Sequence, residues 1–195
     1  MPMGVSKPQR LLRPFAVGFT LLMHLGACDS GDHVSTTLAS RPLVDHHRWT
    51  AVPEARSPFS VDPEHTLCES DDNVRYEELG GEATFAVKTV GCDYATVSQP
   101  SLSLVKAGEN IAIRVWNFSL TSPHGGTASL AIHFGTHVVW HTELPIPSPG
   151  GLHPLNWVAP TDIPKDTPII FHVSNHGQNE YNFIEMTAGT SLDIN

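Results

Sequence analysis

The chain is poor in cysteine, in positive charge and in long apolar segments. Its 195 residues include three cysteines, and 11 lysines and arginines stand against 20 aspartates and glutamates, for a formal net charge of −9. This deficit of cations leaves no basic patch, which excludes a nucleic-acid-binding protein. The apolar run at Phe15–Leu25 is too short to span a bilayer as a helix, and no other run approaches the roughly 18 residues required.

The short motifs of common enzyme classes are also missing. The sequence contains no Gly-x-Ser-x-Gly, no His-Glu-x-x-His, no phosphate-binding loop and no dinucleotide fingerprint. Adjacent acids such as Asp71-Asp72 and Glu77-Glu78 are present, but neighbours on a strand face opposite sides and are typical of a solvated surface. We therefore expect a protein without catalytic activity.

The N-terminus has the three zones of an export signal. Lys7, Arg10 and Arg13 precede the apolar run, which ends in Leu25-Gly26-Ala27-Cys28. This tetrapeptide resembles the lipobox of bacterial lipoproteins. The resemblance covers residues 1–28 and implies that residues 1–27 are removed and that Cys28 is lipidated.

This resemblance implies a place in the bacterial cell envelope, with membrane contact through the lipid anchor alone. Asp29 is similar to an inner-membrane retention signal, but the choice of membrane and of face stays open. Removal of residues 1–27 leaves eight lysines and arginines against twenty acids, a formal charge of −12. An ordinary secretory peptide with an incidental cysteine is the alternative.

The remainder divides by composition into two parts. Residues 28–65 are rich in Ser, Thr, Pro, Asp and His, with apolar residues scattered singly and without a period of 2 or 3.6. Such a segment buries too little apolar surface to offset the entropy of ordering it. We therefore expect a flexible tether over residues 28–65 and a folded domain over 66–195. Trp49, within the tether, either docks on the domain or lies in solvent.

Cys68 and Cys92 remain as a pair once Cys28 carries lipid. In an exported protein two such cysteines indicate a disulfide, which would fasten the first hairpin of the domain to its body. Their spacing matches no zinc or redox motif, so a catalytic or metal-binding pair is the weaker alternative.

From Val74 onward, apolar residues alternate with polar ones, and Gly and Pro separate short segments. In one such segment, the residues Ile111, Ile113, Val115 and Asn117 alternate with Ala112, Arg114, Trp116 and Phe118. This pattern predicts an all-β domain, an antiparallel β-sandwich of jelly-roll or Greek-key type with about eight to ten strands. We expect strands over 74–79, 82–90, 111–117, 130–134, 137–144, 155–159, 169–173 and 181–187, with further alternation at 102–104.

Histidines cluster between residues 124 and 176. The two-residue loop Gly135-Thr136 suits a type II′ turn. A hairpin closed by this turn would place Leu130 of its first strand opposite His141 of its second strand. This register places His133 on one face of the hairpin and both His137 and His141 on the other, where they lie about 13 Å apart along the strand. These three side chains are therefore not expected to share one metal ion. A copper or zinc site would have to be built from loop histidines, with Asn179 or Glu180 as a further ligand.

One stretch resembles cupredoxins. Val105–Asn110 leads through a turn into the segment ending at Asn117, and Pro123-His124 follows, as in the approach to the first copper histidine of those domains. Blue copper needs a cysteine thiolate near the C-terminus, and no cysteine follows Cys92. Blue-copper electron transfer is therefore excluded. A thiolate-free copper or zinc site at His124 and His176 is the remaining metal hypothesis.

Two functions of different class follow. The first is a lipid-anchored binding module without a cofactor that presents loop residues to a glycan, a peptide or an envelope partner. The second is a periplasmic copper- or zinc-binding protein. A calcium site at Glu69, Asp71, Asp72 and Asn73 is a third option for a bound ion. Candidate ligand-binding residues are His124, His153, Trp157, His176, Asn179 and Tyr181.

Overall fold

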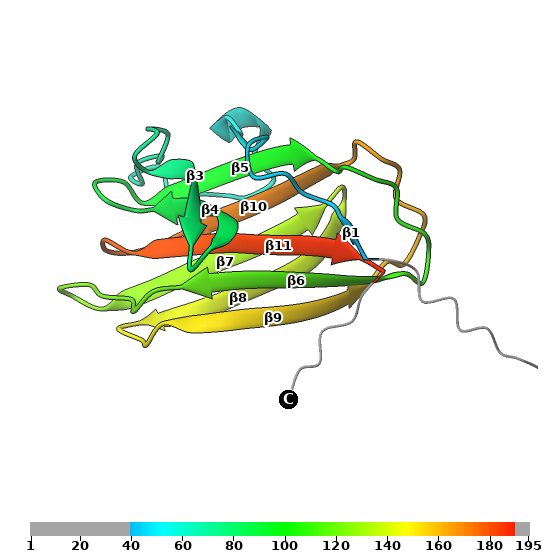
Figure 1. Ribbon diagram of the computed structural model, residues 1–195. Helices are drawn as coiled ribbons and strands as arrows, with labels where there is room; N and C mark the ends of the chain where they lie inside the picture. The colour runs from blue at the N-terminus through cyan, green and yellow to red at the C-terminus, as the bar shows by residue number, and fades with distance from the viewer. Residues whose placement is uncertain (1–39, 190–195) are drawn as a thin grey trace, which may run out of the picture. The chain divides into compact units, whose positions relative to one another are not determined.

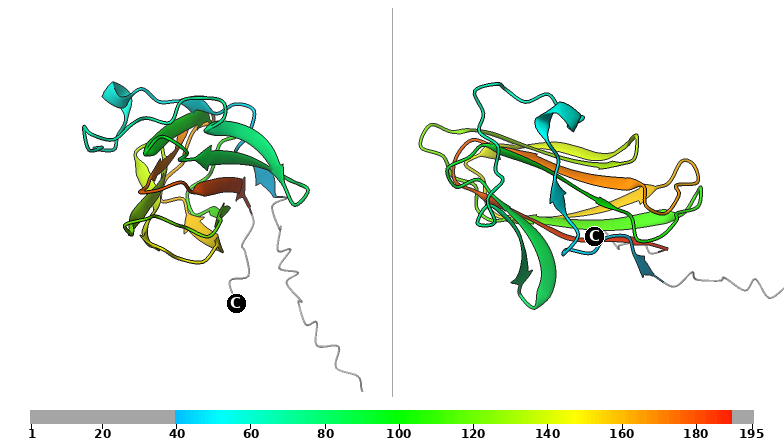
Figure 2. Two further views of the ribbon diagram at one scale, coloured as in Figure 1. Left: turned by 90° about the vertical axis from the view of Figure 1, so that its left-hand side faces the viewer. Right: turned by 90° about the horizontal axis from the view of Figure 1, so that it is seen from above.

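The computed structural model describes residues 40–189, which form two antiparallel sheets packed face to face (Figures 1 and 2). Sheet A has the order β3 (Val74–Leu79), β4 (Glu82–Lys88), β11 (Glu180–Ala188), β6 (Asn110–Asn117) and β9 (Gly151–Val158), with β1 (Arg41–Pro42) also beside β11. Sheet B has the order β2 (Thr50–Ala51), β5 (Tyr94–Pro100), β10 (Pro168–Ser174), β7 (Gly126–Phe134) and β8 (His137–Ile146). The predicted all-β sandwich is confirmed. The signal segment and Cys28 lie outside the described residues.

The strands from β4 to β11 form a jelly roll. They pair from the outside inward, β4 with β11, β5 with β10, β6 with β9 and β7 with β8, as in a long hairpin rolled into two sheets. One edge of each sheet is β8 or β9, and these two edge strands lie next to each other (Figure 1). Within residues 40–189 no helix has the length and apolarity needed to cross a membrane.

The alternation of apolar and polar residues predicted most of the strands, but β5 was not predicted. Ile111, Ile113 and Val115 on β6 are fully buried between the sheets, as their spacing predicts. In β5 the buried positions include Thr96 and Gln99, so the strand lacks a clear apolar pattern. Residues 102–104, expected as a strand, form a loop instead.

The β7–β8 hairpin has the predicted two-residue loop but not the predicted register throughout. Gly135 has a positive φ of 59°, as a type II′ turn requires at its first position. Beyond His133, a bulge makes Val139 an extra residue, so Ala131 rather than Leu130 faces His141. The bulge inverts the alternation of β8, and His141 therefore lies on the same face as His133. The predicted separation of these two histidines is wrong.

Residues 40–65 do not form a tether. β1 pairs with β11, β2 pairs with β5, and Leu43 is fully buried. Trp49 is only 8% exposed and packs against Phe85 and Phe183, with ring centroids 5.5 and 5.2 Å away. The prediction of a flexible segment is therefore wrong for residues 40–65, because a few buried side chains hold it without any periodic pattern.

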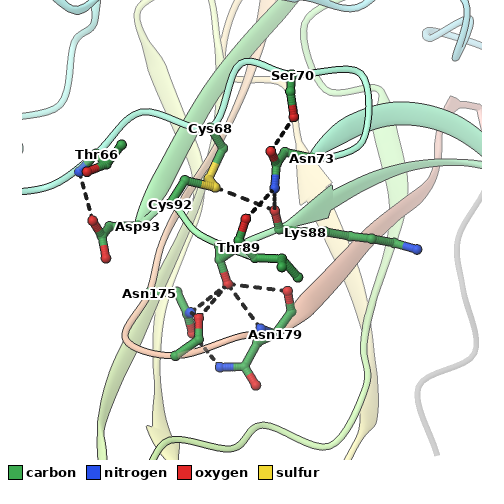
Figure 3. The surroundings of a disulfide bond; sticks show 12 residues. Thr66, Cys68, Ser70, Asn73, Lys88, Thr89, Cys92, Asp93, Asn175 and Asn179 are labelled. Atoms are coloured by element: carbon green, nitrogen blue, oxygen red, sulfur yellow. Dashed lines mark hydrogen bonds between the residues drawn. A yellow bond between two sulfur atoms is a disulfide. The ribbon is translucent and has the colours of Figure 1, made fainter.

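The predicted disulfide is present between Cys68 and Cys92 (Figure 3). The two cysteines bracket the β3–β4 hairpin, so the bond closes the base of this hairpin. The backbone N–H of Cys68 also donates to the carbonyl of Tyr94 at the start of β5, at 2.6 Å. The hairpin is thus attached to both sheets at its base.

The tip of the β3–β4 hairpin leaves sheet A. β4 pairs with β11 only over Phe85–Lys88, and β1 takes its place beside the other end of β11. The free part of the hairpin projects from sheet A on the side away from sheet B (Figure 2). It forms a wall beside the outer face of sheet A.

Candidate functional site

A cavity of about 330 Å³ lies between this wall and the outer face of sheet A. It runs across the strands, from the hairpin tip over β11 and β6 to β9. We call it the sheet A groove, and its lining residues are Leu79, Gly80, Glu82, Thr84, Arg114, Trp116, Phe118, Leu152 and Ile184.

Two aromatic side chains form the centre of the sheet A groove. Trp116 lies on β6 between its lateral neighbours Asn182 and Leu152, and Phe118 follows where β6 ends. Their ring centroids are 6.4 Å apart with the planes at 83°. Phe118 is 41% exposed and Leu152 is 44% exposed, so together they place apolar surface beside Trp116 in one hollow.

A bulge in β11 adds Ile184 to the groove. The register of β11 against β6 shifts between Phe183 and Glu185, so Ile184 is the extra residue. Phe183 before the bulge and Met186 after it both point into the core, while Glu185 lies outward opposite Arg114. Without the bulge, the alternation would direct the Glu185 carboxylate into the core.

The charged groups in the groove are already paired. The Arg114 guanidinium donates to the carboxylates of Glu82 and Glu185, at 2.6 and 2.5 Å. These hydrogen bonds, that with Glu82 first, raise the pKa of Arg114 above its ordinary value. The groove therefore offers polar edges without an unpaired positive charge.

A second cavity of about 210 Å³ also borders Phe118. It lies where β4 and β6 end and β11 begins. Here Lys88 forms ion pairs with Glu180 and Glu77, at 2.8 and 3.4 Å. The remaining lining residues are Val90, Ser119, Gln178 and Asn179. Phe118 thus separates two adjoining hollows on one face.

Two of the predicted ligand-binding residues are structural. Tyr181 is fully buried, and its hydroxyl donates to the side-chain oxygen of Asn175 at 2.7 Å. Burial raises the pKa of this phenol above its ordinary value. Asn179 borders the second cavity, but its amide bonds to Thr121 and Asn175 and holds the β10–β11 loop. Figure 3 shows Asn175 and Asn179 converging near Thr89.

His153 and Trp157 lie on β9 at the open side of the sandwich. The His153 ring bonds to the side-chain oxygen of Asn117 at 2.6 Å, and burial lowers the pKa of the imidazole. Trp157 packs on the core, with its ring centroid 5.9 Å from that of His137. Both face inward on β9, opposite Val115 and Ile111, and neither lines the sheet A groove.

His124 and His176 are both exposed, on the β6–β7 and β10–β11 loops. The Nδ1 atom of the His176 ring lies 3.2 Å from the carbonyl oxygen of Thr127. Among residues 40–189, no group of three or more His, Cys, Asp or Glu side chains is placed to hold a metal ion. The described part of the chain thus gives the copper or zinc hypothesis no third ligand.

The proposed calcium cluster also fails to converge within the described chain. Glu69, Asp71 and Asp72 are exposed. Asn73 instead donates to the carbonyls of Lys88 and Val90, and so joins β3 to the end of β4. The cupredoxin-like stretch Val105–Asn110 forms a turn before β6. In this turn the backbone N–H of Glu109 donates to the carbonyl of Lys106.

One feature of the sequence could have indicated the sheet A groove. Arg114, Trp116 and Phe118 alternate on the side of β6 opposite the core residues, so an aromatic pair on a solvent face was visible. The histidine cluster directed the site prediction to the loops instead. Leu79, Leu152 and Ile184 join the groove only through strand pairing and the bulge, which no local pattern announces.

No family model and no curated protein matches the chain. Among solved structures, it is similar to the carbohydrate-binding module TmCBM61 in complex with β-1,4-galactotriose, with a TM-score of 0.41 and 8% identity over 76% of this chain and 97% of that one. A family 11 carbohydrate-binding module from Clostridium thermocellum, in complex with a mixed-linked tetrasaccharide, gives 0.39 and 11% over 78% and 97%. The arabinose-bound α-L-arabinofuranosidase MgGH51 gives 0.44 and 8% over 77% of this chain, which spans only 25% of that enzyme. At TM-scores below 0.5 these likenesses carry no weight for the ligand, which has to be inferred from the groove itself.

Proposed function

We propose that this domain is a non-catalytic glycan-binding module and that the sheet A groove holds the sugar chain. The observation that carries this proposal is an aromatic pair, the half-buried Trp116 and the exposed Phe118, in a hollow that also contains hydrogen-bonding side chains. A pyranose ring has an apolar face that packs on an aromatic ring and hydroxyls that bond to polar neighbours. The groove supplies both kinds of contact.

The charge pattern favours a neutral polysaccharide. Each cation of this face is matched by a carboxylate, Arg114 by Glu82 and Glu185, and Lys88 by Glu180 and Glu77. A phosphate or uronate would have to displace these partners. Hydroxyl groups can instead bond to the carboxylate and guanidinium edges without breaking the pairs.

The same pairing argues against hydrolysis in this groove. Glycoside hydrolysis needs a carboxylic acid that holds its proton near neutral pH beside a second, ionised carboxylate. Glu82 and Glu185 both bond to the guanidinium of Arg114, which lies between them. The two carboxylates of this groove are therefore engaged by one cation and do not face each other across an open space for a glycosidic bond.

Affinity electrophoresis provides the test. We expect neutral polysaccharides in the gel, from a panel of β-1,4-galactan, mixed-linkage β-glucan and xylan, to retard the protein. Phe118→Ala and Trp116→Ala should each weaken this retention about tenfold or more, since each removes an aromatic contact worth roughly 1.4 kcal/mol or more. Phe118 is the cleaner variant because it is more exposed.

Val138→Ala serves as the matched control. Val138 is 59% exposed on β8, in the other sheet, so its loss removes exposed apolar surface without touching the groove. Its retention should equal that of the unmodified protein. Absence of retardation by any neutral polysaccharide, or equal retention of the Phe118→Ala and Val138→Ala variants, would contradict the proposal.

We further propose that Cys28 carries lipid and anchors the module in a bacterial envelope membrane, in line with the lipobox-like segment Leu25–Cys28. Several acyl chains hold a protein at a bilayer, at about 0.8 kcal/mol per buried methylene. Cys28→Ser should move the protein from the membrane fraction to the soluble fraction after cell lysis, while Cys68 and Cys92 stay paired. Unchanged partitioning would refute the anchor.

A further inference from the structure

Residues 52–67 form a strap across the outer face of sheet B, on the opposite side of the sandwich from the groove. The strap is tied at both ends. At one end Val52 donates to the Thr96 carbonyl beside β2, and at the other Thr66 donates to the Asp93 carboxylate next to the disulfide. Between residues 58 and 65, the hydrogen bonds of the described chain are internal to the strap, as in the turn from Asp62 to His65.

Phe59 attaches the middle of the strap to the sheet. Its ring stacks on His172 of β10 with centroids 4.2 Å apart and planes at 18°, and it packs against His133 of β7 at 4.7 Å. Farther along, the ring of His65 meets that of His176 edge-on at 5.5 Å. Within the described chain, the aromatic rings of Phe59 and His65 thus contact histidines of sheet B and of the adjoining β10–β11 loop.

His172 and His133, which Phe59 contacts, form a histidine patch together with the exposed His141 beside them. His172 lies beside Ala131, which lies beside His141 on the next strand, and His133 is two residues farther along β7. Ala131 thus lies between His172 and His141, and all three histidines are on the outer face of sheet B. The bulge at Val139 is what turns His141 toward this face.

We propose that the strap is an acid-released clasp: protonation of the histidine patch expels Phe59 and frees residues 58–65, while Trp49 and the Cys68–Cys92 disulfide keep both ends attached. The release is local and reversible, because the two tethered ends return the strap to the same face. It uncovers the histidine-bearing face of sheet B in an acidic medium.

The direction follows from proton linkage. Burial, and then the charges of His133 and His141, lower the pKa of His172 from 6.5 to about 4 while the strap covers it. Burial and His141 also lower the pKa of His133. An uncovered imidazole binds its proton near pH 6.5, so the open form takes up more protons between pH 6.5 and 4. Docking is therefore complete above pH 6.5 and weakens as the pH falls through this window.

The groups facing His172 do not oppose this effect. β5 contributes the Thr96 hydroxyl, 2.8 Å from Nδ1, and the Tyr94 ring at 6.4 Å. Burial, Glu54 and Glu69 raise the pKa of Tyr94, so this phenol is neutral throughout the acid range. β7 and β8 contribute His133 and His141, whose charges lower the pKa of His172 further. The carboxylates on the strap, at 54, 62 and 64, are exposed.

Backbone dynamics by NMR tests the clasp on the ¹⁵N-labelled protein. At pH 7.5 we expect heteronuclear NOE values over residues 58–65 close to those of β6. At pH 4.5 the values over 58–65 should fall while those of β6 stay constant, with a midpoint between pH 4 and 6.5. No change over 58–65, or a joint loss in the strap and β6, would overturn the proposal.

Substitutions separate the clasp from a general acid effect. His172→Phe keeps a ring under Phe59 but cannot take a proton, so it should move the midpoint down by at least one pH unit. Phe59→Ala should leave the strap mobile at pH 7.5 already. His124→Ala, which removes an exposed histidine from another loop, should not move the midpoint. Release of the His172→Phe variant at the same pH as the unmodified protein would also refute the clasp.

Discussion

Trp49→Ala is expected to lower the free energy of unfolding by about 3–5 kcal/mol, the range for truncating a large aromatic side chain in a core. Trp49 is 8% exposed and contacts Phe85 of sheet A and Phe183 of β11. Its indole N–H donates to His46 at 3.4 Å. Removal leaves a cavity between the sheets that two aromatic neighbours cannot fill by small shifts.

Urea denaturation followed by circular dichroism measures this loss as a lower midpoint. Val90→Ala is the control, because Val90 is 57% exposed and its truncation should change the stability by less than about 0.5 kcal/mol. A tethered, solvated Trp49 would behave like Val90. Equal stabilities of the two variants would therefore contradict the packing of residues 40–65 on the sandwich.

Asn175→Ala is the second large effect, expected at about 2–4 kcal/mol. The buried Asn175 amide donates to the Thr89 hydroxyl and the Gly177 carbonyl, at 2.7 and 2.6 Å. Its oxygen accepts from Tyr181 and Asn179. Truncation leaves several buried polar groups without this partner, and each unsatisfied group costs about 1–3 kcal/mol.

The Tyr181→Phe variant shows how much stability the loss of a single hydrogen bond in this network costs. The phenylalanine keeps the ring in the core and removes one hydrogen bond, so the expected cost is about 1 kcal/mol. Thermal and urea unfolding should rank the variants in the order unmodified protein, Tyr181→Phe, Asn175→Ala. A cost for Asn175→Ala no greater than that for Tyr181→Phe would show that Asn175 is not the centre of the network.

The alternation of apolar and polar residues predicted those strands that have one face in the core and the other in water. β6 and the Gly135-Thr136 hairpin loop belong to this class, and the disulfide followed from the cysteine count. β5 was missed because its outward Thr96 is covered by the strap and bonds to His172, so its two faces differ little in polarity. Residues 40–65 were missed because single buried side chains, with no period, hold them.

Two β-bulges determine on which face of their sheet His141 and Glu185 lie, which the alternation of apolar and polar residues could not predict. The extra residue Val139 brings His141 beside His133, and the extra residue Ile184 keeps Glu185 outward and adds an apolar group to the sheet A groove. A bulge depends on how two strands pair, and its position is therefore absent from the hydrophobic pattern of either strand alone.

The sequence by itself determined the all-β class, the pairing of Cys68 with Cys92 and the alternation of Arg114 and Trp116 with the apolar residues of the same strand, because each follows from composition or from a period of two. Only the tertiary structure determined which solvent-facing residues come together to line the sheet A groove. The rolled hairpin brings β4, β11, β6 and β9 side by side, and the departing tip of the β3–β4 hairpin then walls one face. Within residues 40–189 the loop histidines belong to no group of three or more metal-ligating side chains, and His153 instead bonds to Asn117. The groove arises from long-range strand pairing, which local periodicity does not encode.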